Sequence, residues 1–207
     1  DIKNSDSQKL TSENYFTYTD TFFDGKLSSN FVLGASWYYN HAEESSSGSE
    51  QYFDDSFGYH NLSAGTTWHE PKSGMNQNTM NSYYFRMNHS FLDRYLLGFT
   101  FRTDGASNFG MNNKYAYFPS VSAGWRISEE KFFSPVKDVL SQMKLRASYG
   151  IVGNASIPNY RTISQYSNGS TIFNKALTSY VVLSNLGNKD LKWESSRQFN
   201  IGVDMSF

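Results

Sequence analysis

Two segments of the sequence contain side chains that could bind calcium or activate a nucleophile. Asp104-Gly105-Ala106-Ser107-Asn108 offers the oxygen ligands that calcium prefers, but it lacks the acid spacing of an EF-hand. Ser134 and Lys137 match the Ser-x-x-Lys pattern of penicillin-recognising hydrolases, yet no Ser-Asp-Asn or Lys-Thr-Gly element accompanies them. We therefore expect the first segment to be a loop in which Asp and Asn cap backbone groups. The second is expected to begin a short helical connection at Ser134, with Pro135 at its first position.

Histidines and neighbouring acids could form a zinc site or an acid/base pair. The histidines are separated by 19, 9 and 20 residues, so no two share a helical turn or one face of a short strand. Adjacent acids such as Glu129 and Glu130 point in opposite directions on an extended chain, and we expect them to be surface charges. The sequence therefore predicts neither an enzyme nor a metal or cofactor site. The histidines, expected to be solvated or at a membrane interface, are His41, His60, His69 and His89.

The composition excludes several further classes of protein. The 207 residues carry 18 basic and 19 acidic side chains, a balance that gives no electrostatic basis for binding nucleic acid. There is no cysteine for a disulfide framework or a thiolate metal site. No apolar run approaches the ~20 residues of a membrane-spanning helix. The combination of a mean hydropathy of -0.58 with 17% aromatic residues nevertheless requires an explanation, because large rings are placed on a polar chain.

Hydrophobic periodicity along the chain favours strands over helices. Tyr95, Leu97, Phe99 and Phe101 alternate with Leu96, Gly98, Thr100 and Arg102, which is the period-two pattern of a strand with one apolar face. The same alternation recurs along the chain and predicts seven strands in all. The other six lie near residues 15–23, 31–39, 83–91, 121–128, 144–151 and 199–207.

The predicted strands favour a membrane barrel over a soluble sandwich. They are ~9 residues or longer, the length that a tilted strand needs to cross a bilayer, whereas sandwich strands are usually nearer ~5–6 residues. One face is apolar, while the other carries arginine among glycine and serine, as expected of a polar lumen. The connections are also sorted by length, as in a barrel with long outer loops and short periplasmic turns. We assign residues 43–79, 104–115 and 153–193 to the extracellular side, and residues 24–26, 92–94 and 129–143 to the periplasmic side.

Aromatic residues gather near both sets of connections. Tyr83, Phe118 and Trp193 lie near the long connections, and Phe91 and Tyr95 lie near a short one. Such rings would form the two girdles that mark the membrane interfaces of a barrel. Seven strands cannot close a bacterial barrel, whose strand number is even and at least ~8, and an open sheet would leave unpaired edges in lipid. The chain is therefore expected to be one portion of a larger barrel.

Five ordered motifs in the second part of the sequence carry a family resemblance. They are RYLL (94–97), RTDGASNFG (102–110), YFPSVSAGWRISEE (117–130), LRASYGIVGN (145–154), and NLGN with DLKWE and FNIGVD (185–204). In this order they resemble the SusC/RagA family of TonB-dependent outer-membrane transporters of Bacteroidota. Residues 1–79 fit that family by pattern only.

The resemblance implies an all-β fold, namely an antiparallel transmembrane β-barrel of about 22 strands with a plug domain in its lumen. This chain would supply about seven of those strands and no plug. The family implies location in the cell outer membrane and uptake of oligosaccharides or peptides. The implied partners are a SusD-like surface lipoprotein, TonB acting through the plug, outer-membrane lipid, and a glycan or peptide substrate. The alternative is a non-transporting structural or docking protein in a larger surface or secretion assembly.

Two sets of residues are candidates for contacts in such a barrel. Charged residues on the polar face would pair with plug acids or line the substrate path, or would serve only as wall charges: Arg86, Arg102, Arg126, Arg146 and Asp204. Rings in the long loops would contact the partner or the substrate, because exposed rings stack on sugars or fill protein pockets. These rings are Tyr59, Trp68, Tyr160, Tyr166 and Tyr180.

Overall fold

The computed structural model describes the backbone of residues 1–207 and every side chain except those of Asp55 and Phe57. It divides into two compact units. The first unit comprises Asp1–Thr11 and Tyr38–Thr79, and the second comprises Ser12–Trp37 and Met80–Phe207. Among the described residues, no helix is both long enough and apolar enough to cross a membrane.

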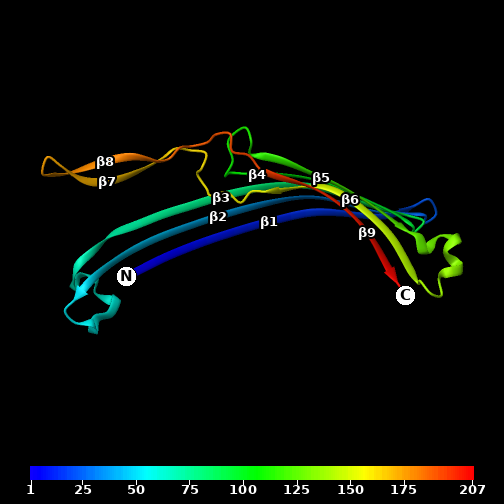
Figure 1. The fold of residues 1–207 in the computed structure, drawn as a ribbon, viewed down its shortest axis with the longest axis horizontal. Coiled ribbons are helices and arrows are strands. Elements are labelled where there is room, and N and C mark those ends of the chain that lie inside the picture. The colour runs from blue at the N-terminus through cyan, green and yellow to red at the C-terminus, as the bar shows by residue number, and fades with distance from the viewer. The chain divides into compact units, whose positions relative to one another are not determined.

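Strands make up most of the chain, and seven of them form one antiparallel sheet in the order β1-β2-β3-β4-β5-β6-β9 (Figure 1). The two remaining strands, β7 and β8, pair with each other as a separate hairpin. The predicted all-β fold with a seven-stranded sheet is confirmed. The strand bounds are β1 Ile2–Phe22, β2 Leu27–Tyr52, β3 Gly65–Phe91, β4 Tyr95–Ala106, β5 Tyr115–Arg126, β6 Gln142–Asn154, β7 Gln165–Phe173, β8 Ala176–Asn185 and β9 Glu194–Ser206.

The strand register in the second unit gathers the apolar residues on one face of the sheet. Tyr95 of β4 lies opposite Phe91 of β3 on one side and Trp125 of β5 on the other. Trp125 in turn lies opposite Leu145 of β6, which lies opposite Val203 of β9. Residues directly opposite in an antiparallel pair share a face, and their side chains pack against each other. A slip of one residue would move this whole set to the other face, so the apolar alternation fixes the register.

Tight turns join β1 to β2 and β3 to β4. Leu92 and Asp93 have φ values of 52° and 55°, the type I′ geometry that matches the twist of the flanking strands. The Leu92 amide donates to the Lys26 carbonyl at 2.7 Å, and the Arg126 amide donates to the Arg94 carbonyl at 2.8 Å. The neighbouring connections are therefore hydrogen-bonded to one another at this end of the strands.

The connection between β5 and β6 folds into two short 3₁₀ helices, η3 (Ile127–Glu129) and η4 (Lys131–Val136). The helical connection predicted from Ser134 is present, but it begins earlier, and Pro135 lies inside η4 rather than at its first position. The helical turn can start earlier because the amides of Glu130 and Phe133 bond to the carbonyls of Ile127 and Glu130. Phe133 is buried beneath the connection.

In the first unit, β2 and β3 continue far beyond their predicted ends. The stretch 43–79, expected as a long loop, is strand up to Tyr52 and again from Gly65, with η1 (Asp55–His60) and η2 (Leu62–Ala64) between them. Residues 43–52 and 65–79 are rich in Ser, Glu, Asn and Thr. Because both faces of these strands are polar, the alternation of apolar and polar residues that reveals the other strands is missing here. The backbone groups can still pair in a sheet, since this pairing does not depend on side-chain polarity.

The other two predicted long connections also contain more structure than expected. β4 extends to Ala106 and β5 begins at Tyr115, so the loop predicted over 104–115 is shorter and comprises residues 107–114. The stretch 153–193 contains the β7–β8 hairpin, closed by Asn174 and Lys175 with φ values of 48° and 62°. In Figure 1 the two strands of this hairpin, β7 and β8, are drawn in gold and orange.

Candidate functional site

The register places all five predicted wall charges on the polar face of the sheet. Arg86 lies opposite Thr100, and Arg102 lies opposite Tyr84. Arg126 and Asp204 both lie opposite Lys144, and Arg146 lies opposite Gly124 and Gly202. The predicted alternation is therefore reproduced strand by strand. The five residues are nevertheless spread over the sheet, so they do not form one compact site.

Arg102 is held in a network near the end of β4 that leads into the β4–β5 loop. Its Nε donates to both carboxylate oxygens of Asp104 at 2.8 and 2.9 Å, and its Nη2 donates to Ser82 Oγ at 3.0 Å. The guanidinium carbon lies 5.9 Å from the centre of the Tyr84 ring. Asp104 and Ser82 are buried. Arg102 therefore compensates a buried carboxylate, which limits its freedom to bind a transported molecule.

Arg146 and Arg126 have more exposed contacts. Arg146 Nε donates to Asp204 Oδ1 at 3.2 Å, and about half of each side chain is exposed. Arg126 Nη1 donates to the backbone oxygen of Asp93 in the β3–β4 turn at 3.3 Å. Arg146 and Asp204 thus pair with each other, and Arg126 links the end of β5 to the β3–β4 turn through a hydrogen bond.

Small side chains hollow the middle of the polar face. A cavity of about 490 Å³ is lined by small or polar residues that include Asn88, Gly98, Ser122, Ser148 and Asn200, and also by Lys144 and Arg146. Glycine and serine leave room above the sheet and offer hydroxyl and backbone groups. The hollow therefore suits contacts with a polar partner surface.

An aromatic cluster consists of Phe109 and Phe118, which are buried, and Trp193, which is partly exposed. Phe109 is only 2% exposed. The Trp193 ring stacks on Phe109 at 4.9 Å and meets Phe118 edge-on at 5.4 Å, and its Nε1 donates to the Lys114 carbonyl at 2.9 Å. Phe118 lies opposite Arg102, which places it on the polar face. The prediction of Phe118 and Trp193 as lipid-facing girdle rings is therefore wrong, because period-two parity and loop packing turn both rings away from the apolar face.

The aromatic cluster joins three segments that are distant in the sequence. Asn108 Nδ2 donates to the Ile157 carbonyl at 3.0 Å, and Asn113 Nδ2 donates to the Asp190 carbonyl at 3.3 Å. A Cβ at Gly110 would lie 1.8 Å from the Lys189 carbonyl oxygen, and one at Gly153 would lie 2.1 Å from the Phe118 ring. Both glycines therefore permit a close approach that any side chain would block. The residues of the family-like motifs in this region therefore pack together around the aromatic cluster.

The oxygen-rich segment that suggested calcium takes part in this packing. Asp104 is paired with Arg102, and Asn108 donates to a carbonyl of another segment. Among the residues whose side chains the structure describes, no three histidine or acidic side chains are grouped so as to hold a metal ion. At the Ser134 segment, Lys137 Nζ lies 3.7 Å from Glu129 Oε1. The Lys137 ammonium is therefore directed toward a carboxylate.

The five predicted contact rings lie in separate places. The Tyr59 ring lies 4.2 Å from the His60 ring in a tilted arrangement, and Trp68 Nε1 donates to the Gly65 carbonyl at 2.9 Å, both within the first unit. Tyr166 and Tyr180 are exposed on β7 and β8, and Tyr160 has a φ of 63° in the segment before β7. The five rings are therefore divided between the two units.

The base of the β7–β8 hairpin is fixed by polar bonds. Arg161 Nη1 donates to Asn185 Oδ1 at 2.7 Å, and Asn185 Nδ2 donates to the Ile163 carbonyl at 3.2 Å. The Gly187 amide donates to Ser164 Oγ at 3.1 Å. The hairpin exposes large apolar side chains on both faces. Tyr166, Ile172, Leu177, Val181 and Leu183 share one face, and Phe173 lies on the other.

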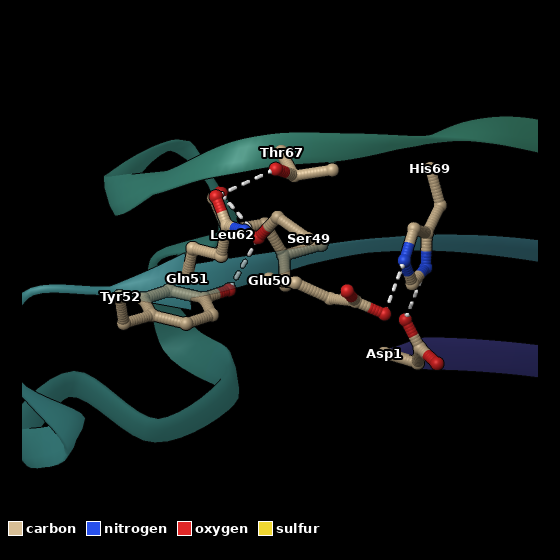
Figure 2. A network of polar contacts seen from close by, with 8 residues as sticks. All are labelled: Asp1, Ser49, Glu50, Gln51, Tyr52, Leu62, Thr67 and His69. Carbon is tan, nitrogen blue, oxygen red and sulfur yellow. Dashed lines mark hydrogen bonds and ion pairs between the residues drawn. The ribbon is translucent and has the colours of Figure 1, made fainter.

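His69, which the sequence predicts to be solvated or interfacial, lies between two carboxylates of the first unit (Figure 2). Its Nδ1 lies 3.0 Å from Asp1 Oδ1 and its Nε2 lies 2.8 Å from Glu50 Oε1, so it links β3 to residues before β1 and on β2. Nearby, Ser49 Oγ contacts the Tyr52 hydroxyl and donates to the Leu62 carbonyl at 2.6 Å. No spacing rule predicts these contacts, because they depend on the pairing of polar strands.

Glu130 forms a second contact that sequence reasoning missed. Its carboxylate accepts from Tyr95 Oη at 2.7 Å, Arg94 Nη1 at 3.0 Å and Trp125 Nε1 at 3.1 Å. Its side chain is 12% exposed, so the prediction of a surface charge is wrong for this residue. The hydrogen bond from Tyr95, followed by that from Trp125, lowers the pKa of Glu130 below its ordinary value. Glu130 therefore anchors the β5–β6 connection to interfacial rings of the apolar face.

Comparison with known families identifies the fold. The family model for the β-barrel of TonB-dependent receptor-like proteins matches residues 2–207. The chain belongs to the TonB-dependent receptor β-barrel family. Barrels of this family are outer-membrane structures.

Relatives and solved structures agree with this family. TonB-dependent receptor P3 of Formosa agariphila is 35% identical over 196 residues, which is 94% of this chain and 19% of that protein. TonB-dependent receptor SusC of Bacteroides thetaiotaomicron is 38% identical over 141 residues, 63% of this chain and 13% of SusC. The structure of the RagAB peptide transporter superposes with a TM-score of 0.86 at 25% identity, over 97% of this chain and 22% of that one. This TonB-dependent receptor chain thus spans about a fifth of the length of P3 and of the matched RagAB chain.

Proposed function

We propose that this chain forms part of the barrel wall of an importer that takes up oligosaccharides or peptides together with a SusD-like surface lipoprotein. The supporting observation is the similarity to the RagAB peptide transporter, which extends over 97% of the chain with a TM-score of 0.86. Of the two substrate classes, the name of this neighbour favours peptides. Its relatives are receptors and transporters rather than enzymes.

In this proposal the two faces of the sheet have different roles. The apolar face meets lipid, and the polar face lines the lumen, where a plug coupled to TonB would fill the space above the small-residue hollow. Arg86 and Arg126 would contact plug acids or the passing substrate, while Arg102 and Arg146 keep their pairs with Asp104 and Asp204. Residues 43–79, 104–115 and 153–193 would lie outside the cell, and residues 24–26, 92–94 and 129–143 in the periplasm.

The exposed rings of the outer segments would serve recognition. Tyr59 and Trp68 belong to one unit, and Tyr160, Tyr166 and Tyr180 to the other. The lipoprotein is expected to contact the β7–β8 hairpin, because that element combines a fixed base with large apolar side chains exposed to solvent. The exposed rings of Tyr59 and Trp68 would then stack on sugar rings or on peptide side chains.

Uptake by cells that lack the full-length gene tests the proposal. We expect deletion to abolish growth on one class of oligopeptide or oligosaccharide, and re-expression of the wild-type gene to restore it. Purification of the restored protein should recover a surface lipoprotein. Unchanged growth on every peptide and glycan tested would contradict the importer.

A substitution within the wall provides a second test. Arg126→Trp places a bulky ring on the polar face and removes the bond to the Asp93 carbonyl. If Arg126 faces the plug, uptake should fall while expression in the outer membrane stays normal. Leu97→Trp, on the apolar face, is the matched control and should leave uptake unchanged. Normal uptake by the Arg126→Trp protein would contradict a role at the plug.

A further inference from the structure

We propose that residues 131–139, between β5 and β6, form an interfacial segment that binds the phospholipid head-group region of the membrane beside the barrel wall. This inference rests on the placement of the apolar face in lipid. It assigns the β5–β6 connection a ligand, namely the lipid surface.

The first observation is the side-chain pattern of the interfacial segment. Phe133 is buried against the protein, whereas Phe132 is 66%, Val136 48% and Val139 73% exposed. Phe132 and Val136 lie within η4, and Val139 lies in the turn that directly follows it, so the three exposed apolar groups come from one short stretch of chain. A connection surrounded by water would have no reason to present three neighbouring large apolar groups to solvent.

The second observation is continuity with the lipid-facing wall. The Phe132 ring meets the Trp125 ring edge-on at 6.4 Å, and Trp125 lies on the apolar face opposite Tyr95 and Leu145. Glu130, directly before the segment, accepts hydrogen bonds from both Trp125 and Tyr95. The interfacial segment is therefore held on the lipid side of the sheet, away from the polar face.

The third observation is the charge beside the apolar groups. Lys131 and Lys137 are both exposed and bracket Phe132 and Val136. Lysine at a membrane interface extends its ammonium to the lipid phosphates while its aliphatic stem lies along apolar groups. Glu129 lies 3.7 Å from the Lys137 ammonium and Asp138 follows it in sequence, so Lys131 is the better placed of the two cations for phosphate. This combination of rings and lysines is typical of segments that lie in the head-group region.

Quenching by lipid-borne groups tests the proposal in the full-length receptor. This chain contains no cysteine, so Phe132→Cys and Val139→Cys can each carry a single bimane label once any cysteines elsewhere in the protein are replaced. The labelled protein is placed in vesicles of phosphatidylethanolamine and phosphatidylglycerol that contain a lipid with a nitroxide near its head group. Leu97→Cys, on the apolar face, is the lipid control, and Thr171→Cys, in β7, is the water control.

We expect lipid quenching at residues 132 and 139 to approach that at residue 97 and to exceed that at residue 171 several-fold. Strong quenching at 97 with water-like behaviour at both 132 and 139 would overturn the interfacial segment while leaving the barrel placement intact. Water-like behaviour at 97 itself would overturn both. Protection of residue 132 in cell envelopes but not in lipid vesicles would also overturn the proposal, and would indicate a protein partner.

The role of the lysines is tested with Lys131→Gln carrying the label at residue 132. The unsubstituted protein should be quenched more strongly in vesicles with phosphatidylglycerol than in vesicles with phosphatidylcholine, and Lys131→Gln should lose most of this difference. Lys175→Gln, at the tip of the β7–β8 hairpin, is the matched control and should retain it. An unchanged lipid preference in Lys131→Gln would overturn phosphate binding by this lysine.

Discussion

The aromatic cluster and the β7–β8 hairpin both come from stretches that look like long loops, yet they use their apolar residues in opposite ways. Phe109 in the cluster is 2% exposed, whereas Phe173 in the hairpin is 73% exposed. The β4–β5 loop crosses the chain that enters β9, so its rings are enclosed by another segment. The hairpin has two strands and no covering layer, and two strands alone cannot bury a side chain between layers. Apolar loop residues therefore stabilise one region and remain available for contact in the other.

Truncating a ring should separate the two regions most clearly. Phe109→Ala is expected to lower the free energy of unfolding by about 3–5 kcal/mol, because it leaves a cavity in the cluster. Phe173→Ala, the matched control, removes the same ring from an exposed position and should change stability by less than about 0.5 kcal/mol. Urea unfolding of the full-length receptor in lipid vesicles measures both values. Equal losses would show that the hairpin is also packed.

Adding a methyl group at a glycine should also destabilise the cluster more than the hairpin, but by less than the removal of a ring does. Gly110→Ala directs a Cβ at the Lys189 carbonyl oxygen, so backbone must move, and we expect a loss of about 1–3 kcal/mol. Gly169→Ala meets the Tyr180 ring instead, which can rotate away on the exposed hairpin. The same unfolding assay should find little effect at residue 169. A tolerated Gly110→Ala would contradict the close approach of the two segments.

The polar contacts of the wall extend the comparison of enclosed and exposed groups. Glu130→Gln should destabilise the protein at neutral pH, because the carboxylate accepts from Arg94, Tyr95 and Trp125. The folded-state pKa of Glu130 lies below its ordinary value of 4.5, so its stabilising effect is complete above that pH and is lost as pH falls through the folded-state pKa. Unfolding measured from pH 7 to pH 3 should therefore show the wild-type and Glu130→Gln curves converging at the acid end. Parallel curves would contradict this role.

Arg146→Gln is the exposed counterpart to Glu130→Gln. The Arg146–Asp204 pair is about half exposed, and such pairs contribute about 0–1 kcal/mol. We expect its loss to be smaller than that of Glu130→Gln at pH 7 and to shrink further in high salt, since salt screens exposed charges. A loss as large as that of Glu130→Gln would show that the polar face is enclosed in the complete barrel.

Removing the hairpin should have the smallest effect on folding and a large effect on assembly. Replacement of residues 165–185 by a short Gly-Ser linker leaves the aromatic cluster and every sheet strand in place. The unfolding free energy should stay within about 0.5 kcal/mol of the wild type. Recovery of the lipoprotein on purification should fall sharply if the exposed rows form its contact surface. A loss of stability with normal recovery of the lipoprotein would contradict the proposal, because it would show that the hairpin stabilises the fold rather than contacts the lipoprotein.

The sequence predicts the strands and the faces of the sheet better than it predicts the structure of the loops. Alternation such as that of residues 95–102 identifies strands and faces, because a period of two follows from strand geometry alone. It fails for residues 43–52 and 65–79, where both faces are polar. Nearness to a long connection predicted that Phe118 belongs to a girdle, but the parity of Phe118 turns it to the polar face. Glu130 was missed because its three donors come from two other strand ends, which only the folded sheet brings together.

The sequence by itself determined the fold class, the two faces of the sheet and the family, since these depend on local periodicity and on ordered motifs. Tertiary structure decided which loop residues are enclosed, where the arginines pair and how the β5–β6 connection attaches to the wall. The Trp193 ring stacks on Phe109 because two segments distant in the sequence cross, and Trp125 donates a hydrogen bond to Glu130 because the sheet brings β5 and the β5–β6 connection together. The energies of these contacts depend on burial and distance, and neither quantity is encoded in spacing along the chain.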